Sequence, residues 1–245
     1  MKRRAFIAGV GSVGTLGGIR YATRDPVTEL EVGFWMSEGA AQYDTVVDRV
    51  TEYLELALGL DFWTVTITYG GTIPVESEDG VRPVRRGRWP AQVAMGAMGP
   101  GSLESAVDAN VLVTDGQMRQ APTGIAIPHV ASVGGARYID QLDPPSETPD
   151  PDAYSLPSLS IQVLIHEIGH TLGLRHGHGT VYQTDEGTVA TPMVSAYAWD
   201  SSFETTESLC GDSYETQPVS PRLLTYQFSS CARERLAEYS GGVRP

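Results

Sequence analysis

The sequence predicts an α+β fold in which a run of strands lies between helices. Two patterns carry this prediction: three stretches have helical periodicity or helix-start signals, and short alternating or wholly apolar runs lie between them. The order is a strand, a helix, several strands, a helix, a long irregular segment and a last helix, without an internal repeat. With 245 residues and 41% hydrophobic content, the chain can bury a core as one domain or two small ones.

The first predicted strand is ELEVGFW, at 29–35. A helix is expected within 38–58, where apolar residues recur at helical intervals until Gly59 provides a stop. FWTVTITY (62–69) alternates large apolar residues with threonines, which is typical of a strand with two different faces. Residues 70–106 are rich in Gly, Pro and Arg, and we expect a long surface excursion there.

Three more strands are expected before the next helix. ANVLVTD (109–115) has the pattern of a short buried strand. TGIAIPHV (123–130) is placed at a sheet edge because Pro128 cannot donate to a ladder. GARYID (135–140) is a candidate fifth strand, and DPPSETPDPD (143–152) is expected to be a solvated loop, where a calcium site (Ca2+) is conceivable but has no further support.

Two helices complete the predicted order. The first runs from about 158 to 174 and contains most of the histidines. The chain from 177 to 219 is expected to be mostly irregular. Ser220 and Pro221 then provide an N-cap and a first-turn proline for a last helix, which stops at Gly241.

The N-terminal segment, residues 1–24, has the shape of an export signal. Arg3 and Arg4 precede a weakly apolar, glycine-rich stretch, and this arginine pair resembles the twin-arginine type. We therefore expect an exported, extracellular or cell-surface protein whose folded part is 25–245. A basic strand or a disordered tail is the alternative, and both cleavage near Ala22 and retention as an anchor remain open. No run of about 20 apolar residues indicates an ordinary membrane span.

The chain is strongly acidic. Thirty acidic residues face seventeen basic ones, a net charge of −13, and residues 1–24 carry five bases and no acid, so the remainder carries about −18. Because salt screens repulsion between carboxylates, this surface suggests adaptation to high salt. It also argues against nucleic acid as a partner.

Two cysteines, Cys210 and Cys231, lie near the C-terminus. In an exported protein we expect them to form one disulfide, and two free buried thiols are the alternative. They lie too far from the histidines in sequence to indicate a mixed metal site.

Four of the five histidines lie in LIHEIGHTLGLRHGHG. His166 and His170, four residues apart on one helix face, can bind the same ion. Glu167 can lean over that ion without ligating it, as a general base on a metal-bound water. Gly173 can end the helix in the left-handed conformation, so that His176 becomes the third ligand. A catalytic zinc ion (Zn2+) takes three protein ligands and keeps one open position, whereas a closed structural site would favour cysteines and would not need the glutamate.

The segment HEIGHTLGLRH resembles the zinc signature of the metzincins, a clan of metallopeptidases that includes matrixins, astacins, serralysins and adamalysins. The clan has a methionine turn beneath the metal, for which ATPMVSAY offers Met193, seventeen residues after His176. The resemblance implies a mixed, mostly parallel twisted sheet with an antiparallel edge strand. It also implies an N-terminal subdomain of about 25–176 with the zinc helix and a smaller, irregular C-terminal subdomain of about 177–245.

The subfamily stays open. Astacins and serralysins carry a metal-approaching tyrosine two residues after the turn methionine, where this chain has Ser195, and Tyr197 comes two positions later. The metzincin edge strand lies above the zinc helix and pairs with extended substrate. In this chain the backbone of four residues is expected to do so: Gly124, Ile125, Ala126 and Ile127.

The resemblance implies an exported, monomeric zinc endopeptidase that binds protein or peptide in an extended conformation, with Glu167 as base. Its alternatives are a non-catalytic metal-binding or adhesion module and a processing peptidase with a single partner. Of the two remaining histidines, we expect His129 to be a hydrogen-bonded surface residue and His178 to be a solvent-exposed rim residue.

Overall fold

The computed structural model describes residues 25–99, 103–118, 124–199, 210 and 221–241. The predicted export signal therefore lies outside the described residues. Within them, no helix is both long and apolar enough to cross a membrane.

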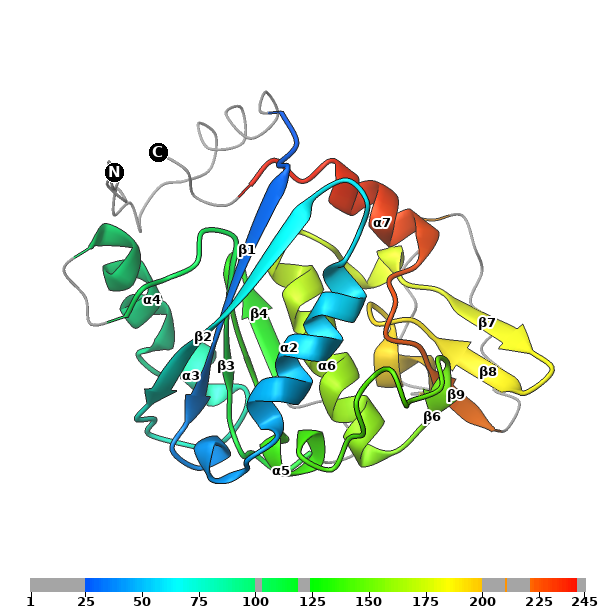
Figure 1. Cartoon of the computed structure of the whole chain (residues 1–245), viewed down its shortest axis with the longest axis horizontal. Helices are drawn as coiled ribbons and strands as arrows, with labels where there is room; N and C mark the ends of the chain where they lie inside the picture. Colours follow the sequence, from blue (N-terminus) through cyan, green and yellow to red (C-terminus); the bar gives the residue numbers. More distant parts are fainter. Residues whose placement is uncertain (1–24, 100–102, 119–123, 200–209, 211–220, 242–245) are drawn as a thin grey trace.

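A five-stranded sheet forms the centre of the molecule, in the order β2-β1-β3-β5-β4 (Figure 1). Strands β2, β1, β3 and β5 are parallel, and the edge strand β4 is antiparallel to β5. The structure thus has the mixed, mostly parallel sheet with an antiparallel edge that the resemblance implies. The strands are β1 (Glu29–Ser37), β2 (Thr64–Ile73), β3 (Ala109–Val113), β4 (Gly124–Ile127) and β5 (Val130–Val133).

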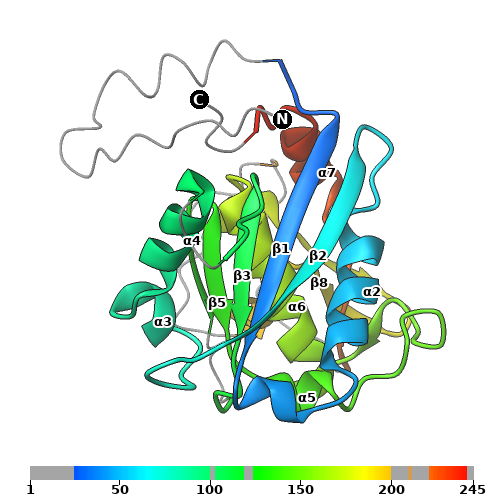
Figure 2. The ribbon, with the colours of Figure 1, turned by 60° about the vertical axis from the view of Figure 1, so that its left-hand side comes forward.

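Helices cover both faces of this sheet (Figure 2). The residues of β3 alternate between two cores: Val111 and Val113 belong to the larger one, beneath α2 and α6, whereas Leu112 packs with Trp35 and Trp89 beneath α3 and α4. This explains why β3 is an unbroken apolar run. The helices are α2 (Val46–Leu58), α3 (Arg82–Arg85), α4 (Trp89–Met98), α5 (Ala136–Ile139) and α6 (Leu156–Thr171), and a 3-10 turn, η1 (Ala40–Gln42), precedes α2.

The prediction of a long surface excursion at 70–106 is wrong, because α3 and α4 form there and bury Trp89 and Val93. Trp89 anchors them: its side chain is 1% exposed, and its indole N–H donates to the Ala131 carbonyl at 2.8 Å. The ring also packs against Trp35, with a centroid distance of 5.2 Å. The many Gly, Pro and Arg residues around Trp89 obscure this apolar anchor in the sequence.

The predicted strand at 135–140 is also wrong. The fifth strand is β5, which follows β4 after a tight turn at Pro128 and His129, where His129 has a φ of 68°. Residues 136–139 form the helix α5 instead. Ala136 and Ile139 are three residues apart and both are buried, which is helical spacing.

A second, smaller sheet lies beside the first, in the order β6-β9-β8-β7. Its strands are β6 (Asp152–Ala153), β7 (Val181–Thr184), β8 (Gly187–Ala190) and β9 (Arg222–Leu224). The predicted irregular segment 177–219 therefore contains the hairpin β7–β8, although part of that segment lies outside the described residues. Two 3-10 turns, η2 (His176–His178) and η3 (Ser195–Trp199), flank the hairpin.

The last helix, α7 (Ser230–Ala237), is shorter than predicted. The residues expected to begin it form β9 instead, in which Leu223 and Leu224 are buried between β6 and β8. The N-cap of α7 is Ser229, whose hydroxyl accepts the Ala232 N–H at 3.1 Å.

Candidate metal centre

Helix α6 carries the first part of the site. It begins at Leu156, where Ser155 and Ser158 form a reciprocal capping box, and ends at Thr171, three residues before the predicted end. Almost every side chain from Ser158 onwards is buried, because the helix lies between the large sheet and the second sheet.

Gly173 turns the chain back, as the sequence predicts. It has a φ of +89°, its N–H donates to the His170 carbonyl at 3.1 Å, and the Leu174 N–H donates to Gly169 at 2.9 Å. This turn brings His176 beside the helix.

The three predicted ligands converge. His166, His170 and His176 each offer a ring nitrogen, and these nitrogens lie within 4.8 Å of one another. The Nε2 atoms of His166 and His170 are 3.0 Å apart. The ring centroids of His176 are 5.1 Å from His166 and 4.9 Å from His170. Three nitrogens at this spacing can share one metal ion such as zinc.

The surroundings of the rings support this assignment. His166 Nδ1 lies 2.6 Å from the Pro192 carbonyl, and His170 Nδ1 lies 2.9 Å from the Leu174 carbonyl. A carbonyl only accepts, so each Nδ1 carries the proton and leaves Nε2 free as a ligand. Burial also lowers the pKa of all three histidines, that of His176 to about 4, so the rings are neutral, as metal binding requires.

The side chain of Glu167 extends from α6 to the edge strand β4. Its side chain is 5% exposed, and burial raises its pKa to about 8. The Glu167 carboxyl fits there because Gly124 of β4 has no side chain: a Cβ at Gly124 would lie 2.7 Å from Glu167 Oε1. A dication held by the three histidines would favour the ionised carboxylate. The residues therefore fit a zinc ion with an adjacent base.

Met193 lies beneath the site. It is fully buried in the turn after β8, where the Val194 N–H donates to the Thr191 carbonyl at 3.0 Å. It packs so closely on α6 that a Cβ at Gly169 would be 2.5 Å from its sulfur. The absence of a side chain at Gly169 therefore permits this close packing between α6 and Met193.

Tyr197 is the main residue of the site that the sequence did not assign. Its ring centroid lies 5.0 Å from that of His176 and 6.1 Å from that of His166. Ser195, at the position where two metzincin subfamilies carry tyrosine, is fully buried with a φ of 51°. The approach of the later tyrosine depends on the η3 turn, for which the sequence gives no signal.

Gln162 is a second unassigned residue, one turn before His166 on α6. Its amide nitrogen donates to the carbonyls of Ala190, at 2.9 Å, and Thr225, at 2.8 Å. These bonds tie the metal helix to the ends of β8 and β9. The contact cannot be found from sequence, because Thr225 lies 63 positions away.

His178 is not the exposed rim residue that was expected. It is only 9% exposed, and its Nδ1 accepts the Arg175 N–H at 2.8 Å. Its carbonyl accepts the Ser229 hydroxyl at 2.5 Å, so the N-cap of α7 supports the loop that carries His176. His129 lies at the β4–β5 turn, with its Nδ1 2.9 Å from the Asp108 carbonyl.

Other expectations concern residues around the centre. Cys210 and Cys231 form a disulfide, which links α7 to the segment after η3. Among the described His, Cys, Asp and Glu side chains, only the three histidines form a group of three that could share an ion, so the loop 143–152 offers no such group for calcium. The four residues expected to bind substrate form β4, which pairs on one side with β5.

Comparisons with known proteins add little. No family model matches the chain, and no curated protein matches it either. Among solved structures, the chain is similar to archaemetzincin from Methanopyrus kandleri, with 17% identity over 85% of this chain and 94% of that one and a TM-score of 0.39. The function proposed below therefore rests on the geometry of the site.

Proposed function

We propose that this protein is a zinc-dependent endopeptidase that hydrolyses peptide bonds in extended polypeptides. One observation carries the proposal: three neutral histidines converge on one point, and the buried carboxyl of Glu167, next to His166 in the chain, lies against Gly124 of the edge strand. A structural zinc site would not need a buried carboxyl that ligates nothing.

The chain's own residues account for the chemistry. When bound, zinc would supply Lewis acidity, which lowers the pKa of a water molecule and polarises the scissile carbonyl. His166 and His170 hold their Nε2 atoms in place through the carbonyls that accept from their Nδ1–H groups. Glu167 Oε1 takes a proton from the attacking water and delivers it to the leaving amine nitrogen.

The edge strand β4 is the proposed substrate platform. Strand addition along its outer edge would hold the peptide backbone next to Glu167, because Gly124 lies directly against that carboxyl. Because Gly124 has no side chain, the β4 backbone can lie directly against the Glu167 carboxyl.

The experiment that tests this proposal combines metal analysis with cleavage of a peptide library. We expect about one zinc per chain in the purified protein, and activity that chelation removes and zinc restores. Glu167→Gln should retain zinc and the fold but lose hydrolysis by at least about 100-fold. Full activity in a metal-free sample would refute the proposal, and stoichiometric zinc without any cleavage would favour a binding module.

We also propose that the protein is exported by a twin-arginine route, is monomeric and is adapted to salt. The paired arginines of the N-terminal segment and the net charge of −13 support export and salt adaptation.

A further inference from the structure

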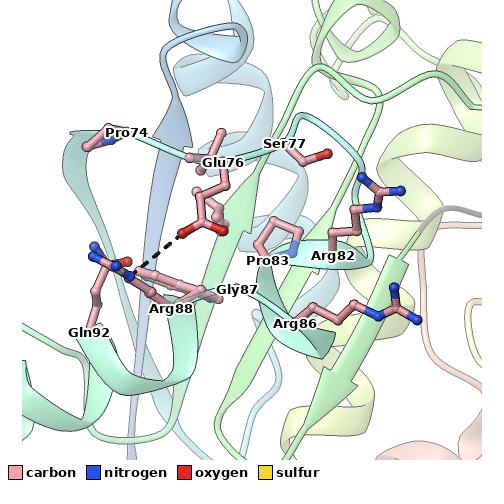
Figure 3. A pocket seen from close by; sticks show the side chains of 12 residues that line it. Pro74, Glu76, Ser77, Arg82, Pro83, Arg86, Gly87, Arg88 and Gln92 are labelled. Atoms are coloured by element: carbon pink, nitrogen blue, oxygen red, sulfur yellow. Dashed lines mark ion pairs between the residues drawn. The ribbon is translucent and has the colours of Figure 1, made fainter.

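A pocket of about 530 Å³ lies on the face of the large sheet opposite the metal centre (Figure 3). It opens between the chain at 74–77 and the helices α3 and α4. Leu112 and Trp89, both buried, contribute apolar surface to it. The pocket thus combines an apolar floor with a polar rim.

Arginines dominate that rim. Arg88 lies on one side with Glu76, where its Nε is 3.7 Å from the carboxylate and both side chains are largely exposed. Figure 3 shows Arg82 and Arg86 on the opposite side of the pocket, both reaching the same way. Within the described part of the chain, neither guanidinium group forms an ion pair with a carboxylate, although the backbone N–H of Arg82 donates to Asp79 at 3.0 Å.

Arg82 and Arg86 are exposed and, like Arg85 beside them, form no ion pair among the described residues, in a chain with 30 acidic and 17 basic residues. Four arginines fall within the seven positions 82–88, and Glu76 forms an ion pair with only one of them, Arg88. An anion between Arg82 and Arg86 would relieve their mutual repulsion. The guanidinium fork matches a carboxylate in charge and shape. Arg82 and Arg86 therefore indicate a site for an external carboxylate.

The edge strand connects this pocket to the proposed cleavage site. Helix α3, which carries Arg82, packs against β4. The side chains of β4 alternate: Gly124 faces Glu167 on the α6 side, whereas Ile125 packs with Val84 and Trp89 on the α3–α4 side. A peptide added along β4 would alternate in the same way. Every second side chain would then point to the face that carries the two arginines.

We propose that Arg82 and Arg86 form a subsite for acidic side chains of the substrate, so that the preferred polypeptides carry glutamate at alternate positions near the scissile bond. Glutamate has one more methylene group than aspartate and would carry its carboxylate further from the peptide backbone toward these guanidinium groups. This inference rests on the proposed peptidase function, because it is that function which places a peptide along β4.

The test uses a set of fluorogenic peptides in which each position near the scissile bond is in turn Glu or Gln. Wild-type protein should show a higher kcat/KM for Glu at one or two alternate positions, by about fivefold for each arginine engaged. Arg82→Gln and Arg86→Gln should each reduce that ratio, and the double variant should abolish it. Arg85→Gln is the matched control, since Arg85 is exposed on the same helix but does not line the pocket.

A binding measurement separates this inference from the proposed function. Fluorescence anisotropy measures the binding of labelled Glu and Gln peptides to the Glu167→Gln variant, in which hydrolysis is suppressed. The affinity ratio of the Glu peptide to the Gln peptide should fall between about 0.1 M and 1 M salt, because salt screens the charges. If wild type cleaves Glu and Gln peptides equally well, the subsite is refuted and the peptidase stands. If nothing is cleaved but the Glu peptide binds more tightly through Arg82 and Arg86, the acidic site stands and the peptidase does not. If binding shows no preference either, the subsite is refuted.

Discussion

Gly124 of the edge strand lies directly against Glu167 of the metal helix: a Cβ at Gly124 would be 2.7 Å from Oε1 and 2.8 Å from Cγ of the carboxyl side chain. A substitution at Gly124, in the strand proposed to bind the substrate, therefore also affects the position of Glu167, the proposed base.

Gly124→Ala should displace the Glu167 carboxyl while leaving the three histidines in place. Because small misplacements of a catalytic group are costly, we expect kcat/KM to fall by about 10- to 100-fold with zinc content unchanged. Ile125→Val, on the opposite face of β4, is the control and should change activity little. Unchanged activity in Gly124→Ala would mean that Glu167 does not need its present position.

His176→Ala and His178→Ala should differ in kind. The first removes a ligand, so zinc affinity and activity should fall together. The second removes a buried ring that accepts the Arg175 N–H, so the free energy of unfolding should fall by about 1–3 kcal/mol while stoichiometric zinc is kept. Metal analysis and denaturant titration distinguish the two. Loss of zinc in His178→Ala alone would show that the third ligand is His178.

Gly169→Ala should destabilise the protein even though alanine favours helices. The added methyl would meet the Met193 sulfur at 2.5 Å and the Phe228 ring at 3.1 Å. Such overpacking costs about 1–3 kcal/mol, more than the gain of about 1 kcal/mol in helix propensity. Met193→Ala in the same chain should make Gly169→Ala less harmful. Additive effects in this double-mutant cycle would argue against direct contact.

We expect the free energy of unfolding to fall at alkaline pH because of Tyr226. Its ring is 1% exposed, its hydroxyl donates to Asp152 at 2.8 Å, and burial, followed by that carboxylate, raises its pKa above the ordinary value of 10.0. The unfolded chain then ionises first, so this stabilisation is complete below about pH 10 and declines as the pH rises further. Denaturant titrations at pH 8 to 11 should show a smaller decline in Tyr226→Phe. Tyr69→Phe, at an exposed tyrosine, should decline like wild type.

Salt should stabilise the fold. With 30 acidic against 17 basic residues, repulsion between carboxylates weakens as ions screen it. We expect the melting temperature to rise between about 0.1 M and 3 M potassium chloride. A flat or falling melting temperature would contradict adaptation to salt.

Much of the large sheet could be predicted, because its strands have local signals. Pro128 led to the prediction that this segment lies at a sheet edge, although in the structure the proline lies in the turn after β4 rather than in its ladder. Helices α3 and α4 could not be predicted, because the burial of Trp89 depends on Trp35 and Ala131, which lie far away in the chain. The same holds for β9, whose burial is decided by its neighbours β6 and β8.

The convergence of the three histidines could be predicted, because helical spacing and one glycine turn determine it. Tyr197 and Gln162 could not, since their positions depend on the η3 turn and on β9. The burial of His178 was not predicted for a related reason: its surroundings include Ser229, 51 positions away, whose hydroxyl donates to the His178 carbonyl. Local patterns thus identify the candidate ligands, and distant contacts determine what surrounds them.

Strand β9 lies inside the second sheet, between β6 and β8, although it is the last strand among the described residues. During synthesis, the helix with His166 and His170 therefore leaves the ribosome well before β9 and Thr225, whose carbonyl accepts from Gln162. Until β9 is present, the backbone N–H and C=O groups of β8 that pair with it are unpaired and can bind another polypeptide. A chain cut short before β9 would therefore carry His166, His170 and His176 but lack the Thr225 carbonyl that accepts from Gln162 on the same helix.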